Sequence, residues 1–285
     1  MAATAPLVAA GDAFARGEDA RSSTALAEVD AALRDATRAG HLPGVVVMAA
    51  TDQGVIYEGA FGSRHVGEPP AMTRDTVFRI ASMIKLITSV AAMQLVEQGK
   101  LGLDDPAPAI DPALAAPQVF TGCDGSGAPL MRPASQPITL RHLLTHTAGF
   151  TYRLWDPQVL RYQQACGALP ARQRAALPHA PLMFDPGTRW QYGTGIDWVG
   201  RIVESVSGER LDVYFRDHIL EPLGMADTGF TLSAAQRVRE ASTHRRKPDG
   251  SLTAEPLEKP SHPTAFSAAA ASIRRRRTTS RCSAR

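Results

Sequence analysis

The spacing of apolar and polar residues predicts a helix followed by a β-hairpin near the start of the chain. Between Thr24 and Thr37 the apolar residues recur at intervals of three and four, which is the spacing of one helix face. Apolar runs over residues 44–51 and 55–62 are joined by the turn Asp52-Gln53-Gly54, as in an antiparallel hairpin. We therefore expect one helix packed beside two paired strands.

Further along the chain, the pattern predicts mainly helices. The longest runs from Ser82 to about Gln98 and is stopped by Gly99. Shorter helices are expected at 139–146, 196–207 and 211–219, whereas the seven prolines of residues 102–138 indicate irregular connections. The fold class is therefore expected to be α/β (α+β): an antiparallel sheet flanked by helices, with a mostly helical and irregular insert over 102–191.

Ser82 and Lys85 are the strongest candidates for chemistry. Residues three apart lie on one helix face with Cβ atoms about 5–6 Å apart, so a hydroxyl and an amine can share a hydrogen bond there. Such a bond activates a weak nucleophile, and a helix start favours the negative charge that develops on attack. The apolar neighbours of Lys85 predict a buried amine, and burial favours its neutral, basic form. The alternative is a capping serine with a solvated lysine, because Ser-x-x-Lys also arises by chance.

Two other signals are less specific. His142 and His146 are four residues apart and have the spacing of metal ligands on one helix face. Leu143 stands where a zinc protease carries glutamate, so structural histidines are favoured over a metal site. Tyr192 lies between a Pro-Gly turn and a predicted helix, where packing or hydrogen bonding is the commoner role of a tyrosine.

The composition is that of a globular protein without cofactor motifs. Hydrophobic residues make up 44% and charged residues 21% of the 285 residues. No apolar run reaches the roughly 18 residues of a membrane span, and residues 1–6 lack the basic start and apolar core of a secretion signal. The three cysteines are widely separated, without the paired spacing of zinc or redox sites. We expect a cytoplasmic protein with no cofactor, no metal and no membrane partner.

The last residues carry the positive charge of the chain. Residues 265–285 contain six arginines and no acidic residue, so residues 1–264 carry −3 within the total of +3. The basic balance therefore gives no indication of a nucleic-acid partner. One choice of codons for this tail, shifted by one base, encodes a glycine-rich segment followed by Leu-Tyr-Ser-Thr. We expect an aberrant basic tail produced by a frameshift; an ordinary disordered basic tail is the alternative.

Four stretches together resemble the serine β-lactamase and penicillin-binding-protein superfamily. They are Ser82-Met83-Ile84-Lys85, residues 142–150, Trp190-Gln191-Tyr192-Gly193 and residues 222–228. The similarity is greatest to the class C-like branch, which includes the family VIII carboxylesterases, and it covers about residues 25–264. We expect a related domain over 24–264, preceded by a loosely ordered segment at 1–23 and followed by the tail at 265–285.

The resemblance implies acyl transfer through a covalent intermediate on a small-molecule ester. Ser82 would be the nucleophile, Lys85 its activating neighbour and Tyr192 the general base or proton shuttle. Thr194 stands where the lactamase branch carries asparagine, which argues against a β-lactamase and favours an esterase. The backbone N–H of Ser82 can supply one oxyanion donor. The Gly-x-Ser-x-Gly elbow of α/β-hydrolases is absent from the sequence.

The family's third motif, a Lys/His/Trp-x-Gly strand near the C-terminus, is not found. We therefore expect a C-terminally truncated domain that keeps only the N-terminal hairpin of its sheet and has marginal stability and little activity. Three alternatives remain open: a non-catalytic relative that binds acyl or peptidoglycan-like ligands, an amide hydrolase of the β-lactamase or DD-peptidase type, and a fragment that does not fold. The sequence gives no indication of the oligomeric state.

Overall fold

A computed structural model describes the backbone of residues 11–168, 181–257 and 272–273, and the side chains of 24–168 and 181–257. The described chain forms two compact units. The first contains residues 11–78 and 232–257, and the second contains 79–168, 181–231 and 272–273. The domain expected over 24–264 is thus divided into two units.

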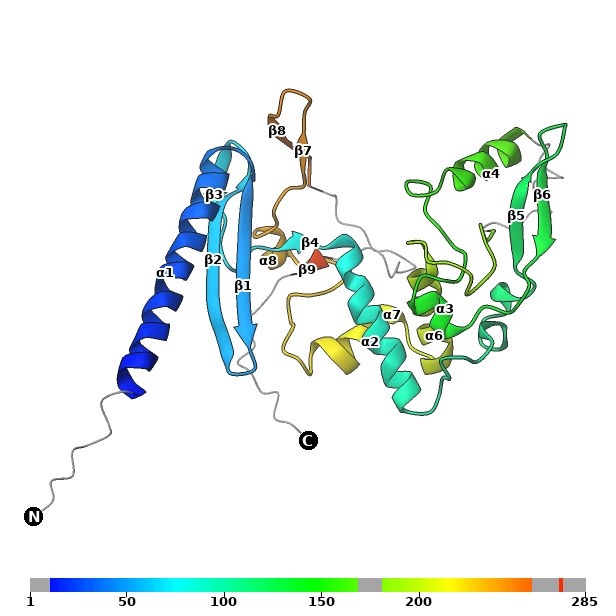
Figure 1. Cartoon of the computed structure of the whole chain (residues 1–285), viewed down its shortest axis with the longest axis horizontal. Helices are drawn as coiled ribbons and strands as arrows, with labels where there is room; N and C mark the ends of the chain where they lie inside the picture. Colours follow the sequence, from blue (N-terminus) through cyan, green and yellow to red (C-terminus); the bar gives the residue numbers. More distant parts are fainter. Residues whose placement is uncertain (1–10, 169–180, 258–271, 274–285) are drawn as a thin grey trace, which may run out of the picture. The chain divides into compact units, whose positions relative to one another are not determined.

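The first unit is built on an antiparallel sheet with strand order β1-β2-β3. The strands are β1 (Gly44–Thr51), β2 (Gly54–His65) and β3 (Glu68–Ala71), and helix α1 (Gly11–Arg38) packs along β1 and β2 (Figure 1). Between α1 and β2, the Tyr57 hydroxyl donates a 2.8 Å hydrogen bond to Asp30.

The predicted hairpin is confirmed, and two expectations around it are wrong. Strand β3 extends the sheet beyond the two strands that were expected. Residues 11–23 belong to α1, so they are helical rather than loosely ordered; residues 1–10 lie outside the described part.

The first unit also contains a second hairpin. Helix α8 (Ala234–Arg237) precedes β7 (His244–Arg246), which pairs with β8 (Leu252–Ala254). The Nε2 atom of His244 accepts a 3.1 Å hydrogen bond from the Val66 backbone N–H. This bond ties the hairpin to the turn that follows β2.

The second unit has a helical core. The 3-10 turn η1 (Ala81–Met83) leads into α2 (Ile84–Glu97), which contacts α6 (Gly195–Ser207). Helices α3 (Leu140–Leu144) and α7 (Leu211–Phe215) also contact α6 (Figure 1). The side chains buried along α2 and α6 include Ile84, Ile87, Ala91, Leu95, Ile196, Val199 and Val203. Burying each large aliphatic side chain contributes about 1.5–3 kcal/mol, so this interface stabilises the unit.

The helix predictions hold to within a few residues. Thr139 caps α3 by accepting a hydrogen bond from the His142 N–H, and Gly208 ends α6 with a φ of 74°. The predicted helix over 211–219 is α7 continued by the π-helical turn η4 (Arg216–Leu220).

The prediction of an irregular segment over 102–138 is partly wrong. The 3-10 turns η2 (Ala107–Ala109) and η3 (Pro112–Leu114) are followed by a hairpin of β5 (Gln118–Cys123) and β6 (Pro129–Pro133). The prolines that argued against a strand lie at the two ends of β6, where a missing N–H is tolerated. Helix α4 (Pro157–Ala168) packs on this hairpin.

Most of the predicted tail lies outside the described residues. Within it, β9 (Ser272–Ile273) pairs with β4 (Phe78–Arg79). None of the helices in the described part of the chain is long and apolar enough to cross a bilayer.

Candidate active site

Ser82 lies in the 3-10 turn η1 and Lys85 in the first turn of α2, close to the expected start of the helix. The Lys85 Nζ donates a 3.0 Å hydrogen bond to the Ser82 Oγ. The Lys85 side chain is buried, whereas Ser82 is exposed and open to an approaching molecule. Ala81, just before the serine, has a φ of +45°, a left-handed conformation that is rare for a residue with a Cβ. Backbone strain of this kind clusters at active sites, and here it immediately precedes the proposed nucleophile.

Tyr192 completes the group of three residues that the sequence analysis singled out. The Lys85 Nζ lies 5.2 Å from the centroid of the Tyr192 ring. Burial acts to raise the pKa of Tyr192, but hydrogen bonding from Ser82 and Lys85 and the charge of Lys85 outweigh it and leave the pKa below the usual 10.0. The structure therefore brings a hydroxyl, an ammonium and an acidified phenol together.

Two further aromatic residues border this group, and sequence reasoning missed both as site residues. Tyr152 lies with its ring centroid 5.5 Å from that of Tyr192 and 5.8 Å from the Lys85 Nζ. Burial raises the pKa of Tyr152 to about 12, so it stays protonated where Tyr192 is acidified. The ring centroid of His146 lies 4.8 Å from that of Tyr192. Only the stretch 142–150 of the resemblance pointed to this region of the chain.

The loop that delivers Tyr192 is held at its start by an ion pair. Arg132, on β6, donates two hydrogen bonds of 2.9 and 2.6 Å to the Asp185 carboxylate. The Ser135 N–H donates a third at 2.8 Å. The hydrogen bond from Arg132, followed by that from Ser135, holds the pKa of Asp185 far below its usual range. Asp185 therefore stays ionised and anchors the loop to the β5–β6 hairpin.

A second set of contacts holds the same loop close to Tyr192. Arg189 donates to the buried Asp156 carboxylate at 3.4 Å, and its guanidinium lies 4.4 Å above the Phe184 ring. The Gln191 N–H donates a 3.0 Å hydrogen bond to the His146 carbonyl. A Cβ at Gly193 would collide with the Phe150 carbonyl, so only glycine allows the chain after Tyr192 to pass this closely. The segments that carry Tyr152, His146 and Tyr192 are thus bound to one another.

The comparison with known families agrees with this geometry. Residues 29–274 match the sequence model of a family described as "Beta-lactamase". The chain belongs to the beta-lactamase family. The resemblance inferred from four short stretches is confirmed, and so is the mixed α/β fold class.

Two of the curated proteins with similar sequences come from fungi. The chain is 38% identical over 243 residues to "Acyltransferase mokF" of Monascus pilosus. The matched region covers 81% of this chain and 59% of that protein. It is 40% identical over 209 residues to "Lovastatin esterase" of Penicillium rubens, covering 71% of this chain and 52% of that protein.

A solved structure shows the same fold. Unliganded simvastatin synthase from Aspergillus terreus superposes with a TM-score of 0.77 at 31% identity, over 87% of this chain and 64% of that one. The chain thus spans between about half and two thirds of the length of these three proteins.

The two histidines considered as metal ligands have different surroundings in this family member. His142 belongs to the cap of α3, where its Nδ1 accepts a 3.3 Å hydrogen bond from the Thr139 N–H. Burial lowers its pKa, which suits an acceptor role. His146 instead contacts the ring of Tyr192. The described residues contain no cluster of three or more histidine, cysteine or acidic side chains that could hold a metal ion.

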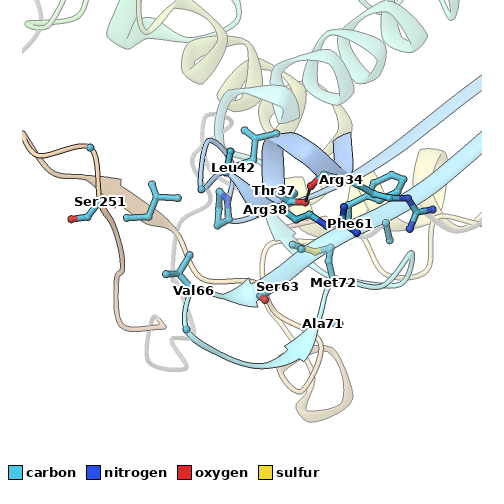
Figure 2. Close-up of a pocket in the computed structure, with 18 residues that line it drawn as sticks. Arg34, Thr37, Arg38, Leu42, Phe61, Ser63, Val66, Ala71, Met72 and Ser251 are labelled. Carbon is cyan, nitrogen blue, oxygen red and sulfur yellow. Dashed lines mark hydrogen bonds between the residues drawn. The ribbon is translucent and has the colours of Figure 1, made fainter. Parts of the chain in front are cut away.

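A cavity of about 700 Å³ in the first unit is lined by none of the three candidate residues (Figure 2). Its walls come from the end of α1, the β2–β3 region and the loop of the β7–β8 hairpin, and Arg34, Phe61 and Met72 are among them. Arg34 already pairs with Asp30 at 2.8 Å. The cavity walls lack a paired nucleophile and base, so the candidate active site is the group around Ser82.

Proposed function

We propose that this chain is a serine hydrolase of the carboxylesterase type, which transfers the acyl group of a small-molecule ester through an acyl-enzyme on Ser82. One observation supports this most directly: the Ser82 Oγ accepts a 3.0 Å hydrogen bond from the Lys85 Nζ, which lies 5.2 Å from the centroid of the Tyr192 ring. A serine hydroxyl is a weak nucleophile unless a neighbouring group takes its proton. The proposal assigns that role to Tyr192, whose pKa is lowered by Ser82 and Lys85.

In the acylation step, the Ser82 Oγ forms a bond to the ester carbonyl carbon and gives its proton to Tyr192. The lowered pKa of Tyr192 makes its phenolate available at lower pH than that of a free tyrosine, and Lys85 stabilises this charge. The carbonyl π electrons move onto oxygen, where the Ser82 N–H can donate a hydrogen bond. Collapse of the tetrahedral intermediate breaks the ester C–O bond, and the departing alcohol takes the proton back from Tyr192.

The acyl-enzyme is then resolved by a second nucleophile. Attack by water, with Tyr192 again accepting the proton, releases a carboxylic acid and restores Ser82. Attack by an alcohol forms a new ester by the same proton movements. The similar proteins include one named as an esterase and one named as an acyltransferase, so both acceptors fit the proposal. Thr194, where the lactamase branch has asparagine, makes amide hydrolysis of β-lactams the less favoured candidate.

We further propose that turnover by the 285-residue chain is slow. Among the described residues we assign a single oxyanion donor, the Ser82 N–H, and loss of one such donor costs about 10²–10³ in kcat. The proposed compartment is the cytoplasm, and the proposed partner is a small ester rather than a nucleic acid or a membrane.

Covalent labelling tests the proposed function. The full chain is treated with a fluorophosphonate, which reacts with activated serines, and the labelled residue is located by peptide mass spectrometry. Ser82→Ala should abolish both the labelling and the turnover of a short p-nitrophenyl ester. Ser89→Ala is the matched control, because Ser89 lies on the same helix and its Oγ donates only to the Lys85 carbonyl, at 2.8 Å.

Label on another serine in the Ser82→Ala chain would refute the assignment. Absence of label from the native chain, with the fold intact, would favour the non-catalytic, ligand-binding alternative. A chromogenic β-lactam in the same assay separates ester from amide hydrolysis.

A further inference from the structure

His146 contacts the Tyr192 loop through both its side chain and its backbone. The His146 and Tyr192 rings are tilted by 57° with centroids 4.8 Å apart, and the Trp190 ring meets His146 edge-on at 6.4 Å. The His146 carbonyl accepts the 3.0 Å hydrogen bond from the Gln191 N–H. His146 itself has a φ of +57°, in the left-handed region that histidine tolerates better than most residues. The position of Tyr192 therefore depends on this one residue in two ways.

The surroundings of the His146 ring disfavour its protonated form. Its Nδ1 is buried and has no hydrogen-bond partner among the described residues. The charged group that acts on it most directly is Lys85 of α2. Tyr192 and Tyr152 are the titratable groups that lie nearest on the neighbouring loops, and Asp197 of α6 acts on these tyrosines. The charged groups of the same loops are paired: Arg189 with Asp156, and Asp185 with Arg132.

A proton on the buried Nδ1 would lack an acceptor and would add a second cation beside Lys85. A buried charge without a partner is strongly disfavoured. A protonated ring is stable only when it turns away toward water, and it then leaves Tyr192 without support. Near α3, the Asp104 carboxylate already accepts from Arg141 and the His142 Nδ1 already accepts from the Thr139 N–H, so neither supplies the missing acceptor.

We propose that His146 is a positioning residue for Tyr192, and that its imidazole must be neutral for the Ser82–Lys85–Tyr192 arrangement to form. The proposal rests on the proposed function of Tyr192 as the proton-transfer group. It assigns His146 no direct contact with substrate.

The electrostatics of the site agree with this role. Burial, followed by the charge of Lys85, lowers the pKa of His146 below 6.5. The imidazole is therefore neutral near pH 7, and its protonated form is populated only in more acidic solution. Activity that depends on the neutral ring should fall on the acid side through the pKa of His146.

Nuclear magnetic resonance tests the proposal without requiring turnover. The imidazole of His146 and the ring of Tyr192 are followed in the full chain between about pH 8 and pH 5. Two variants separate the features of the residue: His146→Asn keeps a side chain suited to a positive φ but removes the ring, and His146→Phe keeps a ring that cannot be protonated. His142→Gln is the matched control, because glutamine at this position retains the capping box of α3.

We expect the Tyr192 ring signals of the native chain to shift with the same midpoint as the His146 imidazole, below pH 6.5. This shift should vanish in His146→Phe and remain in His142→Gln. In His146→Asn the Tyr192 signals should be displaced at every pH. The rate of fluorophosphonate labelling should fall in that variant by about tenfold to a hundredfold, the range expected when a reacting group is misplaced by about 1 Å.

The proposal would be overturned if the Tyr192 signals did not change as His146 titrates. It would also be overturned if the decrease of the labelling rate in acid were the same in His146→Phe as in the native chain. If His146→Phe does not fold because of its positive φ, the titration of the native chain and the His146→Asn variant test whether His146 positions Tyr192. Failure of Ser82 to label in the native chain refutes the proposed function instead, and the Tyr192 titration still reports on the role of His146.

Discussion

The Nζ of Lys85 lies 3.0 Å from the Oγ of Ser82 and 5.2 Å from the centroid of the Tyr192 ring. One buried cation therefore interacts with both the proposed nucleophile and the proposed base. Because Lys85 is buried, its charge acts on both neighbours with little screening. The acidity of Tyr192 and the reactivity of Ser82 should consequently change together when Lys85 is altered.

The first prediction concerns proton transfer. Tyr192→Phe removes only the hydroxyl, so the ring contacts with His146 and Tyr152 are retained. We expect kcat for a p-nitrophenyl ester to fall by about 10²–10⁴, the usual contribution of a general base, while KM changes little. Steady-state kinetics of the native and variant chains measure this. A near-normal kcat in Tyr192→Phe would show that the Tyr192 hydroxyl is not needed for proton transfer and that the residue serves only in packing.

The second prediction concerns the pKa of Tyr192. In the native chain the opposing effects are burial, which raises this pKa, and the hydrogen bonds and charge that lower it. Lys85→Ala removes one hydrogen bond and the charge and leaves the burial, so the pKa of Tyr192 should rise toward or above 10.0. The phenolate then forms only at higher pH. Ultraviolet difference titration, with Tyr192→Phe to identify the signal, measures the shift; an unchanged pKa would contradict the assignment.

The third prediction concerns the anchor formed by Arg189 and Asp156. In this pair the arginine side chain is 53% exposed and the aspartate 7%. Asp156→Asn should reduce kcat while the thermal transition remains cooperative. A double-mutant cycle with Arg189→Ala should give a coupling of about 0.5–3 kcal/mol in the activation free energy.

A second ion pair of the same burial provides the control for this anchor. Arg201 is 54% exposed and Asp111 is 7% exposed, and neither contacts the Tyr192 loop in the interactions described above. Asp111→Asn should therefore lower stability without a comparable loss of kcat. Equal losses of kcat in the two aspartate variants would show that the Arg189 pair has no special role.

The fourth prediction uses the close passage of the chain at Gly193. A methyl group there would overlap the Phe150 carbonyl, so Gly193→Ala should displace Tyr192 and reduce labelling of Ser82 at least tenfold, in line with about 1 Å of misplacement. Gly167→Ala is the control, because Gly167 lies in α4 with open space around its Cα. At that position alanine stabilises the helix by about 1 kcal/mol relative to glycine. Equal labelling rates in the two variants would contradict the prediction.

The fifth prediction concerns the stability of the first unit in acid. Burial, then the nearby charge of His65, lowers the pKa of His244 below 6.5, while its Nε2 accepts the Val66 N–H. Because the folded pKa lies below the unfolded value, this contribution to stability is complete above about pH 6.5 and is lost as the pH falls through the folded pKa. Hydrogen exchange at the Val66 amide, which should accelerate in acid, measures it. The exposed His218→Asn chain should behave like the native one, and an exchange rate independent of this titration would refute the prediction.

Local sequence patterns predicted those parts of the fold and site that depend on nearby residues. The spacing of Ser82 and Lys85 predicted that both lie on one helical turn, and the apolar runs over 44–51 and 55–62 predicted the β1–β2 hairpin. The Tyr192 loop was found through its resemblance to a family, because nothing within the loop specifies which distant residues it meets.

Other features could not be predicted, for identifiable physical reasons. The first half of α1 has no regular apolar spacing, so its sequence gave no signal that the helix begins at Gly11. The β5–β6 hairpin was concealed by Pro129 and Pro133, which are tolerated because they lie at the strand ends. The roles of His146 and Tyr152 arise from ring contacts across long sequence separations and, for His146, from a positive φ.

Trp190 stands between two anchored neighbours: Arg189 binds Asp156, and the Gln191 N–H binds the His146 carbonyl. Its own side chain is 62% exposed. The backbone on both sides of Trp190 is thus fixed, most of its side chain faces outward, and its ring also contacts His146. A set of aromatic side chains at position 190 would keep that ring contact while it varies the surface beside the reacting groups, which makes this position a rational starting point for directing the proposed activity toward new acyl donors.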